Sequence, residues 1–519
     1  MVRRFFQPPW LRESFPLCAT LLVAMALRAL LATQTIVYHA DEVWQYLEPA
    51  YGLITGRWIR PWDYVEGIRG WLIPMLLVPP LALGHSLMPD GQAHIYLVRL
   101  CLALASLGVP LAFYDLARPL SRRHALVAAW AGAVWPEVFY FALRSSGEGI
   151  ALSLLFPAMA LCARTRRAKR GGTAATLAFA AGFLLALGVV VRLQYAPAVA
   201  ILAVWAIGAG RRAGATGPRA LWPFSGISPF SGIWLGAGML AAGALGALAD
   251  LLAGQPPYLW MLRSILVNLE ENRSAFFGTE PPWWLAQAML ADWGLACAAI
   301  VPLALLGARR MPALALVAMV VLGTHSLIPH KEFRFILLTS DTLILLAAVG
   351  SVDVLHRLAR RGGWSEALEI GVGRAFWFAL AVVMALAPAF KDNWGKERIT
   401  YTTMVLAGQQ PGLCGLATYQ LPNHPALAHV FLNRPMSTLM FDGPQAAMQA
   451  AANQGAFNAV LSARADAASL PPAYHLATCY RQAGKPLAEQ RLCLFVRSGG
   501  CTKAAGDFDY QSAMERRGH

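Results

Sequence analysis

The stretch HADEVWQYLEPAY, at residues 39–51, carries acids at a spacing that could serve general-base catalysis. Asp41, Gln45 and Glu48 stand at positions i, i+4 and i+7, so they would share one face of a helix. A carboxylate in a partly dry pocket can act as a general base, because burial raises its pKa toward neutral pH. Glu42 adjoins Asp41, so the assignment between these two acids stays open. The alternative is an amphipathic interfacial helix whose acids are merely solvated.

The stretch HKEFRF, at residues 330–335, gathers cations between two apolar runs. A helix that begins here would bring His330, Lys331 and Arg334 together at its N-terminus, where free N–H groups and the helix dipole favour anions. Arginine suits bidentate phosphate contact and lysine supplies a point charge. The stretch therefore predicts a phosphate site, in which Glu332 neutralises one cation or orients His330. Two alternatives are that Lys331 and Arg334 extend to lipid headgroups, or that His330 and Asp41 bind a metal, although no metal-ligand spacing is present.

The composition places these stretches in a membrane protein. The chain of 519 residues is 57% hydrophobic and 14% charged, with a mean hydropathy of +0.48, whereas soluble domains carry about 25% charged residues. The net charge of +15 collects in short segments, which is typical of loops on the cytoplasmic side of a membrane. We therefore interpret it as a topology signal and expect no nucleic-acid partner. The segments contain Arg3, Arg4 and Arg12; Arg118, Arg122 and Arg123; Arg164, Arg166, Arg167, Lys169 and Arg170; Arg211, Arg212 and Arg219; Arg309 and Arg310; and Arg357, Arg360, Arg361 and Arg374.

Apolar runs long enough to approach a bilayer span recur along the chain. They lie near residues 15–35, 70–88, 95–117, 122–141, 147–163, 173–191, 194–209, 232–253, 284–307, 311–328, 333–350 and 372–390. The run 70–88 contains Pro74, Pro79 and Pro80, which suit a broken or interfacial helix. If it does not cross, every basic segment falls inside. We therefore predict about eleven crossings, with an uncleaved first span, the N-terminus inside and the C-terminus outside.

This topology places ionisable residues together on the outer face. The first outer loop, residues 36–69, contains Asp41 and Glu42, and another, residues 255–282, precedes the run at 284–307. Arg144, Glu148 and Arg192 lie in the short loops between spans. Ionisable residues at membrane depth are costly and usually mark a site. We expect Arg192 to join the phosphate site and Arg144 and Glu148 to line a substrate pocket.

An acid beside a phosphate site on the outer face suggests a transfer reaction. Nucleotide sugars are generally absent outside the cell, but a sugar linked through phosphate to a polyprenyl lipid can be presented there. The base would deprotonate an acceptor hydroxyl, and the cations would stabilise the departing lipid phosphate. A single displacement without a covalent enzyme intermediate inverts the anomeric centre.

Three stretches resemble the mannosyltransferases of glycosyltransferase family 22, which include enzymes of GPI-anchor assembly and lumenal N-glycan assembly. HKEFRF at 330–335 looks like the family's HKExRF signature, and residues 41–51 match its DExxQxxExAY pattern, with Tyr51 where His is common. NRSAFFGTEPPWW at 272–284 is similar to the family's Ser-x-Phe-Tyr-Gly-Thr-His-Pro-Trp segment. Phe277 replaces its Tyr and Glu280 replaces its His, which points to a different acceptor. The motifs span most of the membrane part but not the tail.

The resemblance implies a GT-C fold, an inverting mannosyl transfer and a polyprenyl-phosphate sugar donor. It implies that Asp41 is the base, that Glu42 supports the acceptor, and that His330, Lys331 and Arg334 meet the donor. Phe277 and Glu280 would lie in the substrate pocket together with Gln45 and Glu48. The expected partners are the donor, a lipid-linked or glycan acceptor and membrane lipids. No cofactor is expected to be required, and no metal site is indicated.

The chain divides by composition into a membrane part, residues 1–390, and a small exported soluble domain, residues 391–519. The domain contains Cys414, Cys479, Cys493 and Cys501, which predict one or two disulfides in an oxidising compartment. The segment CLFVRSGGC favours a Cys493–Cys501 hairpin, although other pairings and free thiols stay open.

Two other functions compete with this interpretation. One is a transferase of another polyprenyl-phosphate sugar, such as arabinose, aminoarabinose or glucose. The other is a flippase for lipid-linked sugars, but a transporter should carry inverted repeats and no repeat is visible. The Ala- and Arg-rich composition favours a bacterial inner membrane with a periplasmic site. In a eukaryote the corresponding place is the endoplasmic reticulum, with a lumenal site.

Overall fold

The computed structural model describes residues 9–169, 171–208, 228–421, 427–463, 469–481 and 491–512. The basic residues Arg3, Arg4, Arg170, Arg211, Arg212 and Arg219 lie outside these ranges. The chain folds into two compact units. Unit 1 comprises residues 1–32, 70–72 and 100–392, and unit 2 comprises residues 33–69, 73–99 and 393–519. The predicted division at residue 390 stays a prediction.

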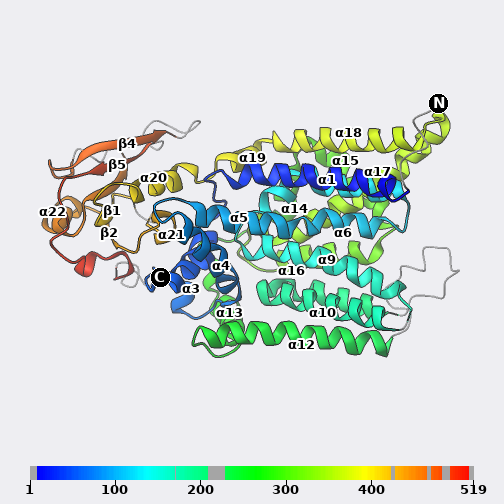
Figure 1. The fold of residues 1–519 in the computed structure, drawn as a ribbon, viewed down its shortest axis with the longest axis horizontal. Helices are drawn as coiled ribbons and strands as arrows, with labels where there is room; N and C mark the ends of the chain where they lie inside the picture. Colours follow the sequence, from blue (N-terminus) through cyan, green and yellow to red (C-terminus); the bar gives the residue numbers. More distant parts are fainter. Residues whose placement is uncertain are drawn as a thin grey trace. The chain divides into compact units, whose positions relative to one another are not determined.

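Unit 1 is a bundle of apolar helices that lie side by side (Figure 1). Its helices are α1 (Pro9–Ala32), α6 (Gly108–Ala117), α7 (Arg122–Val134), α8 (Pro136–Phe141), α9 (Gly147–Arg167), α10 (Gly172–Val191), α11 (Ala196–Ile207), α12 (Pro229–Leu252), α13 (Leu259–Ile265), α14 (Trp284–Trp293), α15 (Cys297–Ala308), α16 (Pro312–Ser326), α17 (Leu337–Gly362), α18 (Glu366–Ala385) and α19 (Pro388–Lys391). Helix α5 (Ala93–Ser106) begins in unit 2 and ends in unit 1.

Within the described residues, eight helical segments are long and apolar enough to cross a membrane. They are Ser14–Ala32, Ala93–Ala117, Gly147–Arg167, Gly172–Val191, Pro229–Leu252, Trp284–Ala308, Phe333–Gly362 and Glu366–Ala385. Each coincides with a predicted crossing. The other predicted crossings correspond to shorter helices: α7 with α8, α11 and α16. These pack inside the bundle, α7 against α6, α17 and α18, and α11 against α16 and α9.

Glycines allow the closest helix pairs of unit 1 to meet at the backbone. A Cβ at Gly182 of α10 would collide with the carbonyl oxygen of Leu235 in α12, and one at Gly238 would collide with that of Phe179. Small residues of this kind are typical of helix packing in membranes, where van der Waals contact is a main source of association.

Unit 2 contains the helical part of the first predicted outer loop. A π-helix, η1 (Glu42–Leu47), leads into α2 (Glu48–Thr55), and α3 (Trp62–Val65) follows. Helix α4 (Leu72–Leu87) is continuous over 16 residues despite Pro79 and Pro80. It is shorter than the eight candidate spans, and the prediction that it does not cross the bilayer is untested.

The tail of unit 2 builds a five-stranded sheet, with α20 (Arg398–Gly408), α21 (His429–Leu432) and α22 (Ala446–Asn453) beside it. The strands are β1 (Gly415–Tyr419), β2 (Ser437–Phe441), β3 (Ala459–Ala463), β4 (His475–Arg481) and β5 (Arg491–Val496), in the order β2-β1-β3-β5-β4. The first three are parallel, and β5 is antiparallel to β3 and β4. Phe441, Phe457 and Phe495 lie in its buried core. The predicted small C-terminal domain is therefore present.

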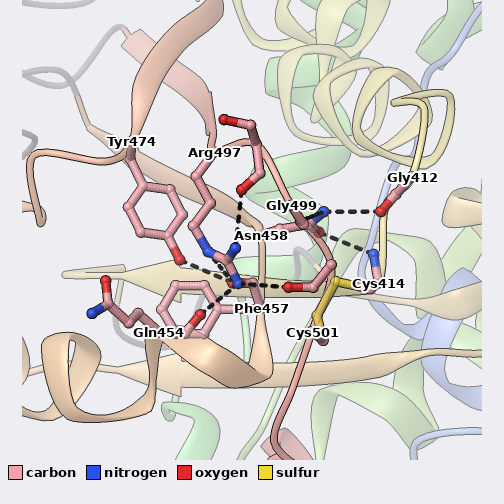
Figure 2. The surroundings of a disulfide bond; sticks show 11 residues. Gly412, Cys414, Gln454, Phe457, Asn458, Tyr474, Arg497, Gly499 and Cys501 are labelled. Atoms are coloured by element: carbon pink, nitrogen blue, oxygen red, sulfur yellow. Dashed lines mark hydrogen bonds between the residues drawn. A yellow bond between two sulfur atoms is a disulfide. The ribbon is translucent and has the colours of Figure 1, made fainter.

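Both disulfides of the tail differ from the favoured Cys493–Cys501 hairpin. Cys493 of β5 lies directly opposite Cys479 of β4 and bonds to it, because the antiparallel register brings their Cα atoms to 4.1 Å. Cys501 lies beyond β5 and bonds to Cys414, at a Cα distance of 5.7 Å. Figure 2 shows this second disulfide beside Asn458, whose side chain donates to Gly412 O and Gly499 O and accepts from Cys414 N.

Candidate active site

Asp41 is the partly exposed member of the acidic stretch in unit 2. It immediately precedes the π-helix η1, and its side chain is 25% exposed. Its Oδ1 lies 3.3 Å from Nδ1 of His39, and its backbone N–H donates to the same nitrogen at 3.2 Å. This carboxylate is therefore partly accessible to solvent.

Glu42 is buried and supports the loop that carries Asp41. Its Oε1 accepts the backbone N–H of Tyr38 at 2.7 Å and that of His39 at 3.3 Å. If Glu42 were the base, as in the predicted alternative, its carboxylate would have to accept a proton while it also holds the backbone of the preceding loop. Glu42 thus holds the backbone before Asp41, and the assignment of the base between these two acids stays a prediction.

Residues 42–47 form a π-helix and not the expected α-helix, and the three side chains differ in burial: Asp41 is partly exposed, whereas Gln45 and Glu48 are buried. Gln45 is buried and its Nε2 donates to Oδ2 of Asp63 at 2.6 Å. Glu48 is fully buried. Its two oxygens accept the backbone N–H groups of Ile59 and Val430, and His429 lies 3.2 Å away. Glu48 therefore joins α2 to the tail within unit 2.

Asp63 was not anticipated from the sequence. Its carboxylate is buried and accepts from Gln45 and from Nε of Arg69, at 2.9 Å. Burial raises the pKa of Asp63, Arg69 opposes that shift, and the nearby charge of Asp41 adds to it. No motif marks Asp63, because its partners lie at spacings that no regular helix brings together.

A buried chain of alternating charges lies in unit 1. Oε1 of Glu148, in the first turn of α9, is 2.8 Å from Nη2 of Arg192 and 3.8 Å from Nε of Arg334. Arg334 also donates to both oxygens of Glu332, from Nε at 2.7 Å and from Nη2 at 3.1 Å. His330 completes the chain, with Nε2 at 3.1 Å from Glu332. The structure thus brings together Glu148, Arg192, His330 and Arg334, and Glu332 links Arg334 to His330.

Phe335 supports the two guanidinium groups of this chain. The Cζ atom of Arg192 lies 4.9 Å from the centre of the Phe335 ring, and that of Arg334 lies 5.6 Å from it. A cation near the face of an aromatic ring is stabilised by the electrostatic attraction of that ring. Two arginines from segments far apart in the sequence are thereby held close to one buried carboxylate, which is an arrangement suited to an anion.

His330 is held between two acceptors. Its Nδ1 lies 3.1 Å from the carbonyl oxygen of Gly278, and its Nε2 faces Glu332. The hydrogen bond to Glu332 raises the pKa of His330 above its ordinary value. Gly278 has a φ of +107°, which L side chains rarely adopt. The Gly of the FFGTEPP segment thus places the carbonyl oxygen that meets His330.

Lys331 is bound to backbone carbonyl groups. Its Nζ donates to the carbonyl oxygens of Glu280 and Ile328, at 2.7 and 2.6 Å, and lies 3.5 Å from that of Pro329. The helix expected to begin at HKEFRF instead begins after it: residues Phe333–Ile336 form a 3-10 helix, η7, and α17 follows. Lys331 therefore precedes the helical segment that contains Arg334, and its place at a phosphate stays a prediction.

The other predicted pocket residues lie in unit 1. Arg144 is buried, with its Cζ 4.3 Å from the centre of the Tyr140 ring. Phe277 is exposed, and its ring centre lies 6.1 Å from that of His330. Glu280 is exposed, and its backbone N–H donates to Pro329 O at 3.0 Å. Phe277 and Glu280 thus belong to the segment that packs on the HKEFRF stretch.

Glu137 is a second buried acid that the sequence could have revealed, since it stands alone in an apolar run. Its Oε2 accepts from Ser340 at 2.7 Å and from the indole N–H groups of Trp135 and Trp293, at 3.2 and 3.3 Å. It links three segments of the bundle. The described ranges contain no group of three or more His, Cys, Asp or Glu side chains arranged to hold a metal ion.

Solved structures support the fold. The structure of ArnT from Cupriavidus metallidurans bound to undecaprenyl phosphate matches with a TM-score of 0.58 and 12% identity, covering 94% of this chain and 98% of that one. The apo structure of the same protein gives a TM-score of 0.54, 12% identity and coverages of 94% and 97%. The fold is therefore GT-C-like, as expected.

Sequence comparisons support the family. GPI alpha-1,2-mannosyltransferase 3 of Mus musculus is 27% identical over 303 residues, which cover 57% of this chain. The match spans about half, 52%, of that curated relative. The model of the Alg9-like mannosyltransferase family matches residues 19–411, which contain all three stretches that carry the resemblance to family 22. The chain belongs to the Alg9-like mannosyltransferase family.

Proposed function

We propose that the protein is an integral membrane glycosyltransferase that moves mannose from a polyprenyl-phosphate donor to a hydroxyl of a lipid-linked or glycan acceptor. The observation that carries the proposal is that Glu148 holds both Arg192 and Arg334. The chain that contains them belongs to the Alg9-like mannosyltransferase family. Guanidinium groups fixed in this way suit a phosphate diester. The solved ArnT structure that shares the fold holds undecaprenyl phosphate, which supports a polyprenyl-phosphate donor here.

In the proposed reaction, Asp41 removes the proton of the acceptor hydroxyl as its oxygen attacks the anomeric carbon. The bond between that carbon and the phosphate oxygen breaks, and the configuration inverts. The departing polyprenyl phosphate gains one negative charge. Arg192 and Arg334 would stabilise that added charge, because preorganised cations act most strongly where charge develops. The chain's own residues supply base and charge stabilisation, and no cofactor is proposed.

The proposed site faces the exterior: the periplasm of a bacterium or the lumen of the endoplasmic reticulum. The reason is that polyprenyl-linked sugars are donors available on that side, whereas nucleotide sugars are not. The test of orientation is labelling of single cysteines introduced into the loops of the full chain in sealed vesicles, with a reagent that does not cross membranes.

The activity is tested with purified full-length protein in detergent, radiolabelled polyprenyl-phosphate mannose and a membrane lipid extract. We expect label to appear on an acceptor with the wild-type chain and not with Asp41→Asn. An Asp392→Asn variant, which removes the same charge outside the described site, is the matched control. Parallel reactions with glucose, arabinose and aminoarabinose donors identify the sugar. Transfer by Asp41→Asn at the wild-type rate would refute the assignment of the base.

If the donor binds but no sugar is transferred to any acceptor, transferase activity is refuted. Flipping of the donor across vesicle membranes would then be measured.

A further inference from the structure

Glu332 occupies the place where an anion would meet Arg334 and His330. Arg334 donates to both of its carboxylate oxygens, at 2.7 and 3.1 Å, and His330 lies 3.1 Å from one of them. Two-point contact between a guanidinium and a carboxylate is the geometry that arginine also uses for phosphate. The contacts of Glu332 therefore resemble those of a bound oxyanion.

Glu148 and Glu332, the two carboxylates in the series of alternating charges, differ in their exposure to solvent. The side chain of Glu148 is 1% exposed and that of Glu332 is 22% exposed, while those of Arg334 and Arg192 are 5% and 8% exposed. A ligand that arrives from solvent meets Glu332 before it meets Glu148. Glu148 can therefore keep both arginines in place while Glu332 leaves.

The backbone also permits Glu332 to move. Glu332 lies just before η7 in an extended conformation, with φ of −130° and ψ of 141°. The backbone of Glu332 thus lies outside the helical turn that holds Arg334. Rotation of the Glu332 side chain away from Arg334 does not require any helix to unwind.

We propose that Glu332 is an internal counter-ion of the donor site: its carboxylate pairs with Arg334 and His330 when no donor is bound, and the donor phosphate replaces it. The inference rests on the proposed function. Exchange of one anion for another keeps Arg334 paired throughout, which avoids the cost of an unpaired buried charge. The exchange also promotes product release, because the returning Glu332 carboxylate competes with the polyprenyl phosphate that remains after transfer.

The test is the affinity of purified full-length protein for undecaprenyl phosphate, with Glu332→Gln compared with wild type. Glutamine keeps an oxygen that can accept from Arg334 but removes the competing charge. We expect the dissociation constant of Glu332→Gln to fall roughly twofold to fivefold. Glu332→Asp keeps the charge, and its affinity should stay at or below that of the wild-type protein.

The matched control is Glu271→Gln, which removes the same charge from the exposed pair of Glu271 and Arg273 in the same unit. Its affinity should equal that of wild type. Because the counter-ion also speeds release, Glu332→Gln should show a lower kcat and a lower KM for the donor. If Glu332 had only a structural role, the Glu332→Gln substitution would instead lower the affinity for undecaprenyl phosphate and raise the KM for the donor.

The outcomes separate the two proposals. If wild type binds undecaprenyl phosphate and Glu332→Gln binds it more weakly, or equally well, the counter-ion is refuted and the donor class stands. If neither protein binds undecaprenyl phosphate or any other polyprenyl phosphate, the donor class is refuted, and the counter-ion with it.

Discussion

Glu148 and Arg192 form a buried ion pair, with 2.8 Å between Oε1 and Nη2, although they lie in different segments of the bundle. The pair fixes the end of α10 to the start of α9 and orients a guanidinium that Phe335 also supports. Its geometry carries the proposed donor site.

Neutralising Glu148 should destabilise the protein, because it leaves two buried arginines without their shared counter-ion. Breaking a buried pair costs roughly 3–5 kcal/mol. We therefore expect Glu148→Gln to lower the midpoint of thermal unfolding by several degrees in detergent. Glu366→Gln is the control, since its pair with Arg122 is partly exposed and pairs of that kind contribute about 0–1 kcal/mol. Equal midpoints for both variants would contradict the role of Glu148.

Glu42→Gln should reduce transfer without abolishing it. The amide can still accept from the backbone N–H of Tyr38, so the loop before Asp41 keeps most of its support. Loss of the base in Asp41→Asn should cost roughly 10²–10⁴-fold in kcat. The two variants are compared by initial rates at saturating donor. If Glu42→Gln is the less active of the two, their roles must be exchanged.

The affinity for donor should fall as the pH rises through the pKa of His330. The hydrogen bond to Glu332 raises that pKa above the ordinary value of about 6.5. The imidazolium, which favours an anion, loses its proton as the pH rises through this raised pKa, so the affinity falls with rising pH. Its other neighbours are Gly278 O, the charge of Arg334 and the rings of Phe277 and Phe335.

The check is the dissociation constant of undecaprenyl phosphate between about pH 5.5 and 8.5, a range that brackets the ordinary histidine pKa. His330→Gln should flatten the dependence. Glu332→Gln should move its midpoint to lower pH, because the largest contribution to the raised pKa is lost. A midpoint that is unchanged in both variants would assign the dependence to another group.

Lys331→Met should affect the 272–284 segment more than donor binding. The ammonium joins Glu280 O and Ile328 O, and methionine removes these bonds. We expect the KM for acceptor to rise and limited proteolysis of this segment to accelerate, with the donor affinity within about twofold of wild type. Arg334→Met should weaken donor binding roughly tenfold or more, since charge-assisted contacts are the stronger ones. A comparable loss of donor affinity in Lys331→Met would restore its predicted place at the phosphate.

The two disulfides of the tail should differ in their contribution to stability. Cys414 and Cys501 are 87 residues apart, and Cys479 and Cys493 are 14 apart. On the chain-entropy model, the longer loop contributes more, roughly 4–5 kcal/mol against about 3 kcal/mol. Replacing Cys414 and Cys501 by Ala should therefore increase proteolysis of the tail more than replacing Cys479 and Cys493. Both double variants are compared with the wild-type full chain. The reverse order would indicate that native contacts, such as those of Asn458, compensate for the first disulfide.

The sequence by itself determined the membrane class, the family motifs and the residues Asp41, Arg192, Glu148 and Arg334 as candidates. These follow from local quantities: the length of apolar runs, the position of basic segments and the cost of charges at membrane depth. The same reasoning anticipated that Glu332 would neutralise a cation or orient His330, and it does both.

Only the tertiary structure decided how those side chains pair. Glu48 is buried against the backbone of Ile59 and Val430 while Asp41 stays partly exposed, and η7 begins only after Lys331. Cys493 pairs with Cys479 through sheet register. The pairing of Asp63 with Gln45 and Arg69 also depends on the tertiary structure. Such pairings depend on helix type, register and contacts between distant segments, and a hydrophobic pattern or a spacing along one segment carries no information about them.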